Sequence, residues 1–120
     1  MNTTSAGAHA EEQAAHYLSH KGYRIVARNF RASGGEIDII ALAKSTLVFV
    51  EVKKRASQAF GGPVAAVTPL KQKRIAQTAA QFIKINTETH YQSVRFDVIC
   101  ISPAGLDHIE NAFFPARMTI

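Results

Sequence analysis

Ionisable side chains lie inside the most apolar stretch of this 120-residue chain. Asp38 stands between two isoleucines and Glu51 stands between two valines, with Lys53 two residues further on. An ionised carboxylate in such surroundings is costly unless it is paired or binds a metal ion. Two carboxylates could hold a hard cation such as Mg²⁺ through their oxygen atoms, and a lysine could orient or activate a water molecule beside it.

The residues around these side chains predict two strands. Two runs of β-branched and large apolar residues are separated by a polar turn at Ala43–Thr46, which is typical of paired strands buried on both faces. Because side chains alternate along a strand, Glu36 and Asp38 share one face of the first strand, and Glu51 and Lys53 share one face of the second. A hairpin register that turns these faces the same way would bring Asp38, Glu51 and Lys53 together.

A purely structural explanation of the same pattern is a buried ion pair that only positions the hairpin, between Lys53 and either Glu51 or Asp38. Buried ion pairs contribute little net stability, so apolar residues would serve a structural strand better. The pattern therefore favours a metal site, and the structural pair remains the alternative.

An ordered series of motifs carries a family resemblance. Asp38, a gap of twelve residues and then Glu51-Val52-Lys53 form the pattern D-x(n)-(D/E)-x-K. This pattern resembles the PD-(D/E)XK nuclease superfamily, with Ile37 where many members have proline. The longer series resembles the YraN family of small bacterial proteins, and consists of GGEIDII from Gly34, VFVEVK-x-R from Val48, Phe60-Gly61 and RFDV from Arg95.

The resemblance implies an α/β restriction-endonuclease-like core of order α-β-β-β-α-β plus a short final strand, with a mixed sheet flanked by helices. It implies a metal-dependent nuclease that hydrolyses phosphodiester bonds in DNA with Mg²⁺ or Mn²⁺. Asp38 and Glu51 would ligate the metal together with the Val52 carbonyl, and Lys53 would position the attacking water. Similarity to archaeal Holliday-junction resolvases suggests branched or junction DNA as the substrate.

Three further side chains are candidates for the site. Glu11 lies in an E-x-x-A-x-x-Y-L segment, where the family places an acidic residue that points into the active site from the first helix. A favourable charge at a helix N-terminus would explain Glu11 equally well. Glu36 shares the strand face of Asp38. Gln72 lies with Lys71 on the sheet-facing edge of a later helix. Glu36 and Gln72 are additional candidates.

Periodicity and turn signals give the element order without the family resemblance. The threonine–proline pair at Thr68-Pro69 is a typical helix start, with an N-cap followed by the first helical position. Outside the hairpin we expect a helix over Ala8–Lys21, a strand over Tyr23–Phe30, an aperiodic loop over Ala56–Val67, a helix from Thr68, a parallel strand over Val94–Ser102 and a short final strand over Leu106–Phe114.

The charge distribution indicates a polyanionic partner. The chain has a formal net charge of +5, and it has no acidic residue from Val52 to Thr87. Such a segment is typical of a surface that faces phosphates, whereas a solvated basic face, with Lys71 extended along it towards water, is the alternative. A nucleic-acid-binding module without catalytic activity would need only this surface. The residues expected to contact nucleic acid are Lys54, Arg55, Lys71, Lys73 and Arg74.

Composition indicates one domain over residues 1–120, with residues 1–7 flexible. No apolar run approaches the ~18 residues of a membrane span, so no membrane partner is expected. The single cysteine, Cys100, suits a reducing cytoplasm. A homodimer would suit an enzyme that cuts two strands, although no segment marks an interface. The sequence leaves open DNA or RNA, endonuclease or exonuclease, and single-stranded, duplex or junction substrates.

Overall fold

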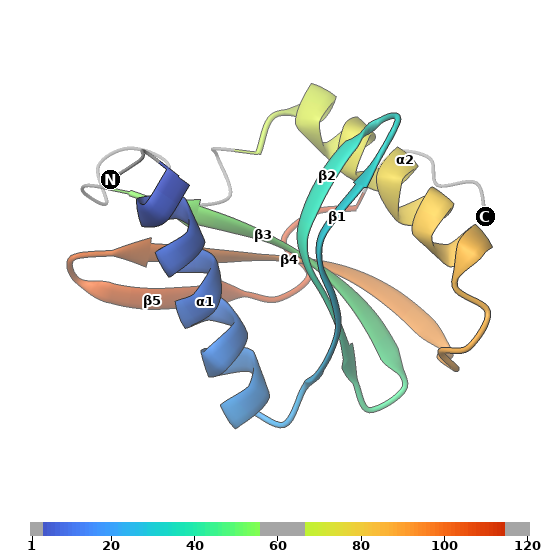
Figure 1. The fold of residues 1–120 in the computed structure, drawn as a ribbon, viewed down its shortest axis with the longest axis horizontal. Helices are drawn as coiled ribbons and strands as arrows, with labels where there is room; N and C mark the ends of the chain where they lie inside the picture. Colours follow the sequence, from blue (N-terminus) through green and yellow to red (C-terminus); the bar gives the residue numbers. More distant parts are fainter. Residues whose placement is uncertain (1–3, 56–66, 115–120) are drawn as a thin grey trace.

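The structure is a computed structural model that describes residues 4–55 and 67–114. In these residues a mixed sheet of five strands in the order β1-β2-β3-β4-β5 is flanked by two helices (Figure 1). The α-β-β-β-α-β-β order is consistent with a restriction-endonuclease-like core, which confirms the predicted fold class. The elements are α1 (Thr4–His20), β1 (Arg24–Ala32), β2 (Gly35–Ala43), β3 (Thr46–Lys54), α2 (Pro69–Ile85), β4 (Ser93–Ser102) and β5 (Gly105–Ile109).

The predicted hairpin is formed by β2 and β3. The strands pair in antiparallel register from Ala43 opposite Thr46 to Ile39 opposite Val50. Lys44 in the turn has a φ of 55°, in the left-handed region that a tight hairpin turn requires. The expected turn at Ala43–Thr46 is therefore confirmed.

Helix α2 connects β3 to the parallel strand β4. Its start is set by Thr68, whose side-chain oxygen accepts a hydrogen bond from the backbone N–H of Lys71, and by Pro69 at the first helical turn. Because the connection crosses over the sheet through a helix, β4 can run parallel to β3, with Val50 opposite Asp97. The predicted N-cap and the predicted parallel strand are both confirmed.

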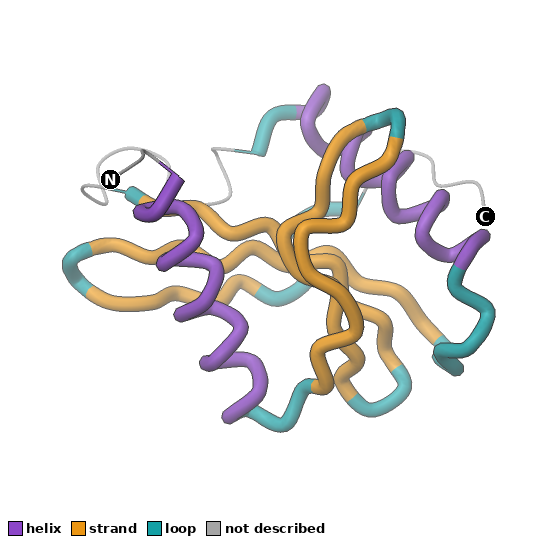
Figure 2. Tube along the Cα trace, in the orientation of Figure 1, coloured by secondary structure: helices purple, strands orange, loops and turns teal. Residues whose placement is uncertain are grey.

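The two helices cover opposite faces of the twisted sheet (Figure 2). On the α1 side, Leu18 packs against a core that includes Ile39 and Val50. On the α2 side, Phe82 packs edge-on against Phe49. Strands β2 and β3 contribute to both cores, which explains their nearly continuous apolar sequence.

Several element boundaries differ from those expected. Helix α1 begins at Thr4 and not at Ala8, and β1 continues two residues past Phe30 to Ala32. The last strand, β5, ends at Ile109 and not near Phe114, because Asn111 turns the chain with a φ of 55°. The predicted loop over Ala56–Val67 and the Phe60-Gly61 motif fall largely or wholly on residues 56–66, which lie outside the described residues, as do residues 1–3 of the expected flexible end.

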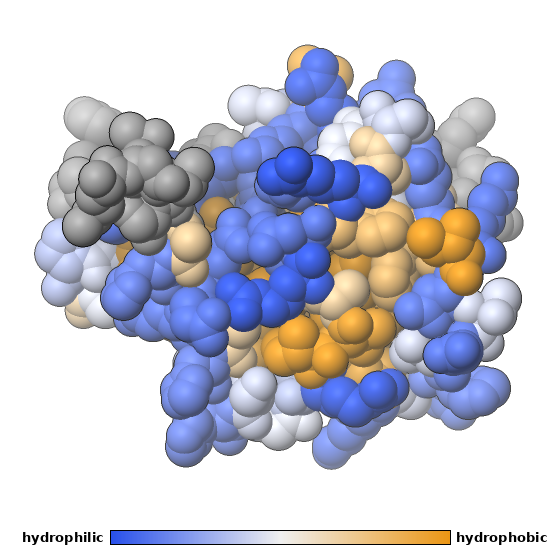
Figure 3. Space-filling model, viewed as in Figure 1, coloured by the Kyte–Doolittle hydropathy of each residue, from blue (hydrophilic) through white to orange (hydrophobic). Residues whose placement is uncertain are grey.

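The surface in the view of Figure 3 is mixed: hydrophilic side chains cover α1, and apolar side chains gather over β1. Among the described residues, no helix has the length and apolar character needed to cross a bilayer. Cys100 is a buried free thiol in β4.

Asp97 in β4 organises a buried polar network. Its carboxylate is fully buried and accepts hydrogen bonds from the Arg95 guanidinium at 2.9 and 3.0 Å and from the Asn111 N–H at 2.9 Å. The His108 ring lies 2.7 Å away and connects to Tyr17 of α1 at 3.0 Å. Burial raises the pKa of Asp97, but the bonds from His108 and Arg95 outweigh it, so the pKa lies below its ordinary value. The network ties α1, β4 and β5 together.

Asp97→Asn should therefore lower the free energy of unfolding by about 2 kcal/mol at pH 7. The asparagine amide would place an NH₂ group opposite hydrogen-bond donors, such as the Arg95 guanidinium, that now bond to a carboxylate oxygen. Because the pKa of Asp97 is lowered in the folded protein, its stabilising contribution is present above its unfolded pKa and is lost as the pH falls through the folded pKa. Urea unfolding measures the difference, with the exposed Glu88→Gln as the matched control. Equal unfolding free energies for Asp97→Asn and wild type would contradict this prediction.

Candidate active site

Strands β2 and β3 separate at the predicted acidic residues. Their paired register ends at Ile39 opposite Val50, and the Val52 N–H donates to Asp38 Oδ2 at 2.8 Å. Side-chain alternation also breaks here, because Ile37 and Ile40 both lie in the core under α2 while Ile39 faces α1. The Asp38 carboxylate thus replaces the next backbone partner across the hairpin, and the sheet opens beside it.

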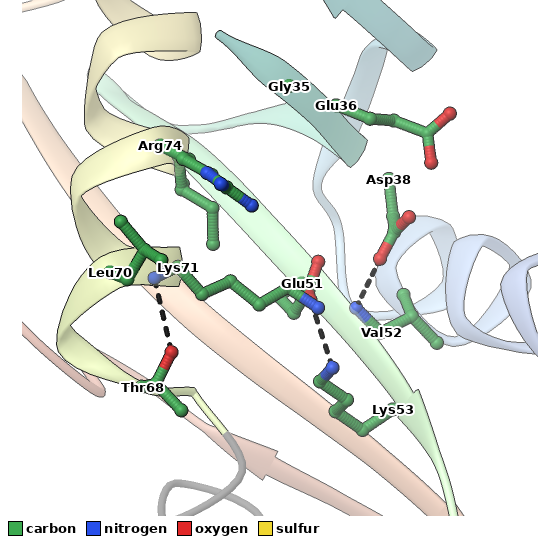
Figure 4. Close-up of a pocket in the computed structure, with 11 residues that line it drawn as sticks. Gly35, Glu36, Asp38, Glu51, Val52, Lys53, Thr68, Leu70, Lys71 and Arg74 are labelled. Atoms are coloured by element: carbon green, nitrogen blue, oxygen red, sulfur yellow. Dashed lines mark hydrogen bonds and ion pairs between the residues drawn. The ribbon is translucent and has the colours of Figure 1, made fainter.

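A pocket of about 510 Å³ lies at this opening, between the hairpin and the start of α2 (Figure 4). Asp38 enters it from β2, with Glu36 at its edge, and Lys71 reaches into it from α2. The residues that line it are Gly35, Glu36, Asp38, Glu51, Val52, Lys53, Thr68, Leu70, Lys71, Arg74 and Ile75.

Glu51 forms ion pairs with two lysines in the pocket. It is 7% exposed, and its Oε2 atom lies 2.5 Å from Lys71 Nζ and 3.3 Å from Lys53 Nζ. Lys53 comes from the same face of β3, as alternation predicts, whereas Lys71 comes from the first turn of α2. The structure thus brings Asp38, Glu51 and Lys53 together as predicted, and adds Lys71.

The two carboxylates differ in their affinity for protons. Burial, together with the neighbouring Glu51 carboxylate, raises the pKa of Asp38 to about 8. Burial also acts to raise the pKa of Glu51, but hydrogen bonds with Lys71 and Asp38 outweigh it and hold that pKa below its ordinary value. Two carboxylates in one apolar site cannot both ionise easily without added positive charge. At neutral pH, Asp38 keeps its proton and Glu51 carries the charge.

The two lysines also differ. Burial, together with the neighbouring Lys71 ammonium, lowers the pKa of Lys53. Burial acts to lower the pKa of Lys71 as well, but its bond to Glu51 outweighs that effect and the pKa lies above its ordinary value. Lys71 is therefore the principal partner of Glu51.

The donor set at this opening fits a hard divalent cation. Asp38 and Glu51 supply carboxylate oxygens, and the Val52 carbonyl shares the side of β3 on which its N–H meets Asp38. In the described part of the chain, no three side chains of His, Cys, Asp or Glu are grouped so as to hold a metal ion. Mg²⁺ commonly binds through one or two carboxylates and takes its remaining oxygens from water and substrate phosphates. A divalent cation bound here would also favour the ionised form of Asp38 beside the Glu51 carboxylate.

The three additional candidates lie further out. Glu36 lines the pocket at its rim, where Arg31 Nε lies 2.6 Å from its carboxylate. Glu11 is half-buried on α1 and does not line the pocket, although its charge contributes to raising the pKa of Asp38 after the larger effects of burial and Glu51. Gln72 does not line the pocket either; its amide donates to the Val67 carbonyl at 3.0 Å and fixes the chain leading into α2.

The predicted phosphate-contacting residues occupy three locations. Lys71 and Arg74 line the pocket, one helical turn apart. Lys73 is exposed on α2 outside it. Lys54 and Arg55 border a separate hollow formed with the end of β4. The contact between Lys71 and Glu51 was missed from the sequence, where only the sheet-facing position of Lys71 in the helix pointed to it.

The glycine pair Gly34-Gly35 allows the β1–β2 hairpin to lie close to α2. A Cβ atom on Gly34 would lie 3.3 Å from Gln77 Cβ, and one on Gly35 would lie 3.6 Å from Thr78 Oγ1. Gly35 also has a φ of 151°, which other residues rarely adopt. Helix α2 therefore packs closely against the glycine pair, and Gly35 also lines the pocket.

Comparison with known proteins identifies relatives along most of the chain. A family model described as "Uncharacterised protein family UPF0102" matches residues 10–101. A UPF0102 protein of Cupriavidus necator is 43% identical over 114 residues, covering 94% of this chain and 86% of its own. UPF0102 proteins of Pelobacter propionicus and Thermodesulfovibrio yellowstonii are each 44% identical, covering 91% and 95% of this chain and 82% and 100% of their own. The chain therefore belongs to the UPF0102 family, which is the YraN family that its motifs resemble.

Proposed function

We propose that this protein is a metal-dependent nuclease that hydrolyses phosphodiester bonds in DNA. The observation that carries the proposal is the buried Asp38–Glu51 pair beside Lys53, in an open pocket whose other charged side chains are mainly basic. Hydrogen bonds with Lys71 and Asp38 hold the pKa of Glu51 below its ordinary value, whereas burial and the Glu51 carboxylate raise the pKa of Asp38 to about 8. This is the electrostatic condition of a site built to receive a cation and a phosphate together.

Asp38, Glu51 and the Val52 carbonyl would hold Mg²⁺ or Mn²⁺. Such an ion polarises a phosphoryl oxygen and lowers the pKa of a bound water. Lys53 is held 3.3 Å from Glu51, on the same strand face, where its ammonium would orient the attacking water and stabilise negative charge developing on the phosphate. Glu11 would assist from α1 through its charge near Asp38.

The basic residues would hold the nucleic-acid backbone. Lys71 and Arg74 line the pocket itself, while Lys73 on α2 and Lys54 and Arg55 at a separate hollow would add further contacts to the backbone. Contacts of this kind are independent of sequence and weaken as salt concentration rises. The family resemblance to junction resolvases favours branched or four-way-junction DNA among the substrates.

A nucleic-acid-binding module without catalysis is the second candidate. It is favoured by the neutralisation of the acids in this structure: Glu51 is paired with two lysines and Asp38 is protonated at neutral pH. A module of this kind should keep or gain affinity for DNA when the acids are removed, because repulsion of phosphate falls. A nuclease should lose turnover while it still binds.

Lys53→Met should separate the two candidates. For a nuclease, we expect the rate of Mg²⁺-dependent cleavage to fall by about 10²-fold or more, with DNA affinity changed only a few-fold. The measurement is single-turnover cleavage of end-labelled duplex and four-way-junction DNA, with binding followed by fluorescence anisotropy. Lys84→Met removes the same charge from an exposed position at the other end of α2 and serves as the control. Equal loss of cleavage in both variants, or in neither, would contradict the role given to Lys53.

A further inference from the structure

Lys71 is in direct contact with the proposed metal site, although it is far from the nuclease motif in the sequence. Its ammonium lies 2.5 Å from Glu51 Oε2, closer than that of Lys53 at 3.3 Å. The backbone N–H of Lys71 donates the N-capping hydrogen bond to Thr68 Oγ1, which fixes the position of its backbone in the first turn of α2. Its side chain is 41% exposed, against 23% for Lys53, so it can leave Glu51 for water without a change in the fold.

We propose that Lys71 is an internal counter-cation: it occupies the Glu51 oxygen when no divalent cation is bound, and moves to the substrate phosphate when one binds. This inference rests on the proposed function and names a regulator of that same site. It gives Lys71 two successive partners, a carboxylate of the protein and an oxygen of the nucleic acid.

The competition follows from the arrangement of charges. Glu51 Oε2 already forms ion pairs with two ammonium groups, those of Lys53 and Lys71. A divalent cation bound to the same carboxylate would repel both at short range. Lys53 is the more buried of the two and is set on the rigid strand, so Lys71 is the group free to move. Removing Lys71 should therefore strengthen binding of a divalent cation.

A second cationic side chain lies beside Lys71 on α2. Arg74 lies three residues further along α2 and also lines the pocket, so the two side chains share one face of the helix. A lysine and an arginine side by side at the mouth of the pocket would present two cationic groups to one phosphate. Lys71 would then favour substrate binding only after it leaves Glu51.

The test is metal and DNA binding by Lys71→Met, measured separately on the full chain. Isothermal titration with MnCl₂, without DNA, should show about tenfold tighter binding than wild type. Anisotropy with labelled duplex DNA, in the presence of Ca²⁺, should show weaker binding. Lys84→Met, with the same change in charge at the far end of α2, should match wild type in the Mn²⁺ titration. Lys71→Gln should reproduce the Lys71→Met result, and it replaces that variant if circular dichroism shows loss of structure.

The outcomes separate the inference from the proposed function. Tighter Mn²⁺ binding with weaker DNA binding supports the inference, since a loss of structure would not improve metal affinity. If wild type binds Mn²⁺ and both Lys71 variants bind it with equal or lower affinity, the inference is overturned. The proposed metal site is not affected by that result. Absence of Mn²⁺ binding in wild type and in both Lys71 variants overturns the metal site, and the inference with it.

Discussion

Asp38→Asn should produce a protein that is more stable than wild type at pH 8 and no longer cleaves DNA. Burial and the Glu51 carboxylate raise the pKa of Asp38 to about 8, far above the ordinary value of 3.8. Between these two pH values the unfolded chain has released the proton that the folded protein retains. Wild-type stability should therefore fall with rising pH across this window by about 1.4 kcal/mol per pH unit from this group alone.

Asparagine has nearly the same shape and no proton to lose. Its side-chain oxygen can still accept a hydrogen bond from the Val52 N–H, and its amide can donate to Glu51, which already bonds with Asp38. The stability difference between variant and wild type should be small near pH 4, grow to several kcal/mol by pH 8 and remain constant above it. Urea unfolding at a series of pH values measures the difference. A variant that is less stable than wild type at pH 8 would contradict the raised pKa of Asp38.

Glu51→Gln should have the largest effect on the chemistry. It removes the charged carboxylate from the pocket and leaves Lys53 and Lys71 without their shared acceptor. Cleavage should fall by about 10³-fold or more, because a ligand that fixes the cation is lost. Affinity for DNA should be kept or should rise, because one negative charge is gone and two ammonium groups are free to meet phosphate.

The same variant gives an independent reading of the electrostatics. Since the Glu51 carboxylate is the second contribution, after burial, to the raised pKa of Asp38, that pKa should fall in Glu51→Gln while remaining above its ordinary value. Carbon-13 NMR of the side-chain carboxyl groups follows the titration of Asp38 directly. If Glu51→Gln cleaves DNA at the wild-type rate, or if the pKa of Asp38 is unchanged in this variant, the two carboxylates do not form one site.

Local patterns were enough to predict the hairpin and the convergence of its charged groups. The turn at Ala43–Thr46 fixed the register, and alternation then placed Glu51 and Lys53 on one face. The N-cap at Thr68 predicted where α2 begins. Each of these features depends on residues close together in the sequence, so periodicity and turn chemistry sufficed to find them.

Features that depend on the packing of distant elements could not be predicted in the same way. Periodicity placed Lys71 on the sheet-facing edge of its helix, but its contact with Glu51 depends on how α2 lies over β3. Strict alternation would put Ile37 and Ile39 on one face, whereas the separation of β2 from β3 turns them to opposite cores. Arg95 and Asp97 are two residues apart on one strand, but His108 and Asn111 complete the network from another strand and its following turn.

The most direct test of the central claim is cleavage of DNA by purified wild-type protein and Asp38→Asn, measured side by side. Labelled single-stranded, duplex, flap and four-way-junction DNA would each be incubated with Mg²⁺, Mn²⁺ or EDTA, and products resolved on a denaturing gel. We expect cleavage of at least one substrate by wild type with either metal, none with EDTA, and none by Asp38→Asn, which still binds. Absence of product from every DNA with both metals, or equal product from the variant, would contradict a metal-dependent DNA nuclease at this site.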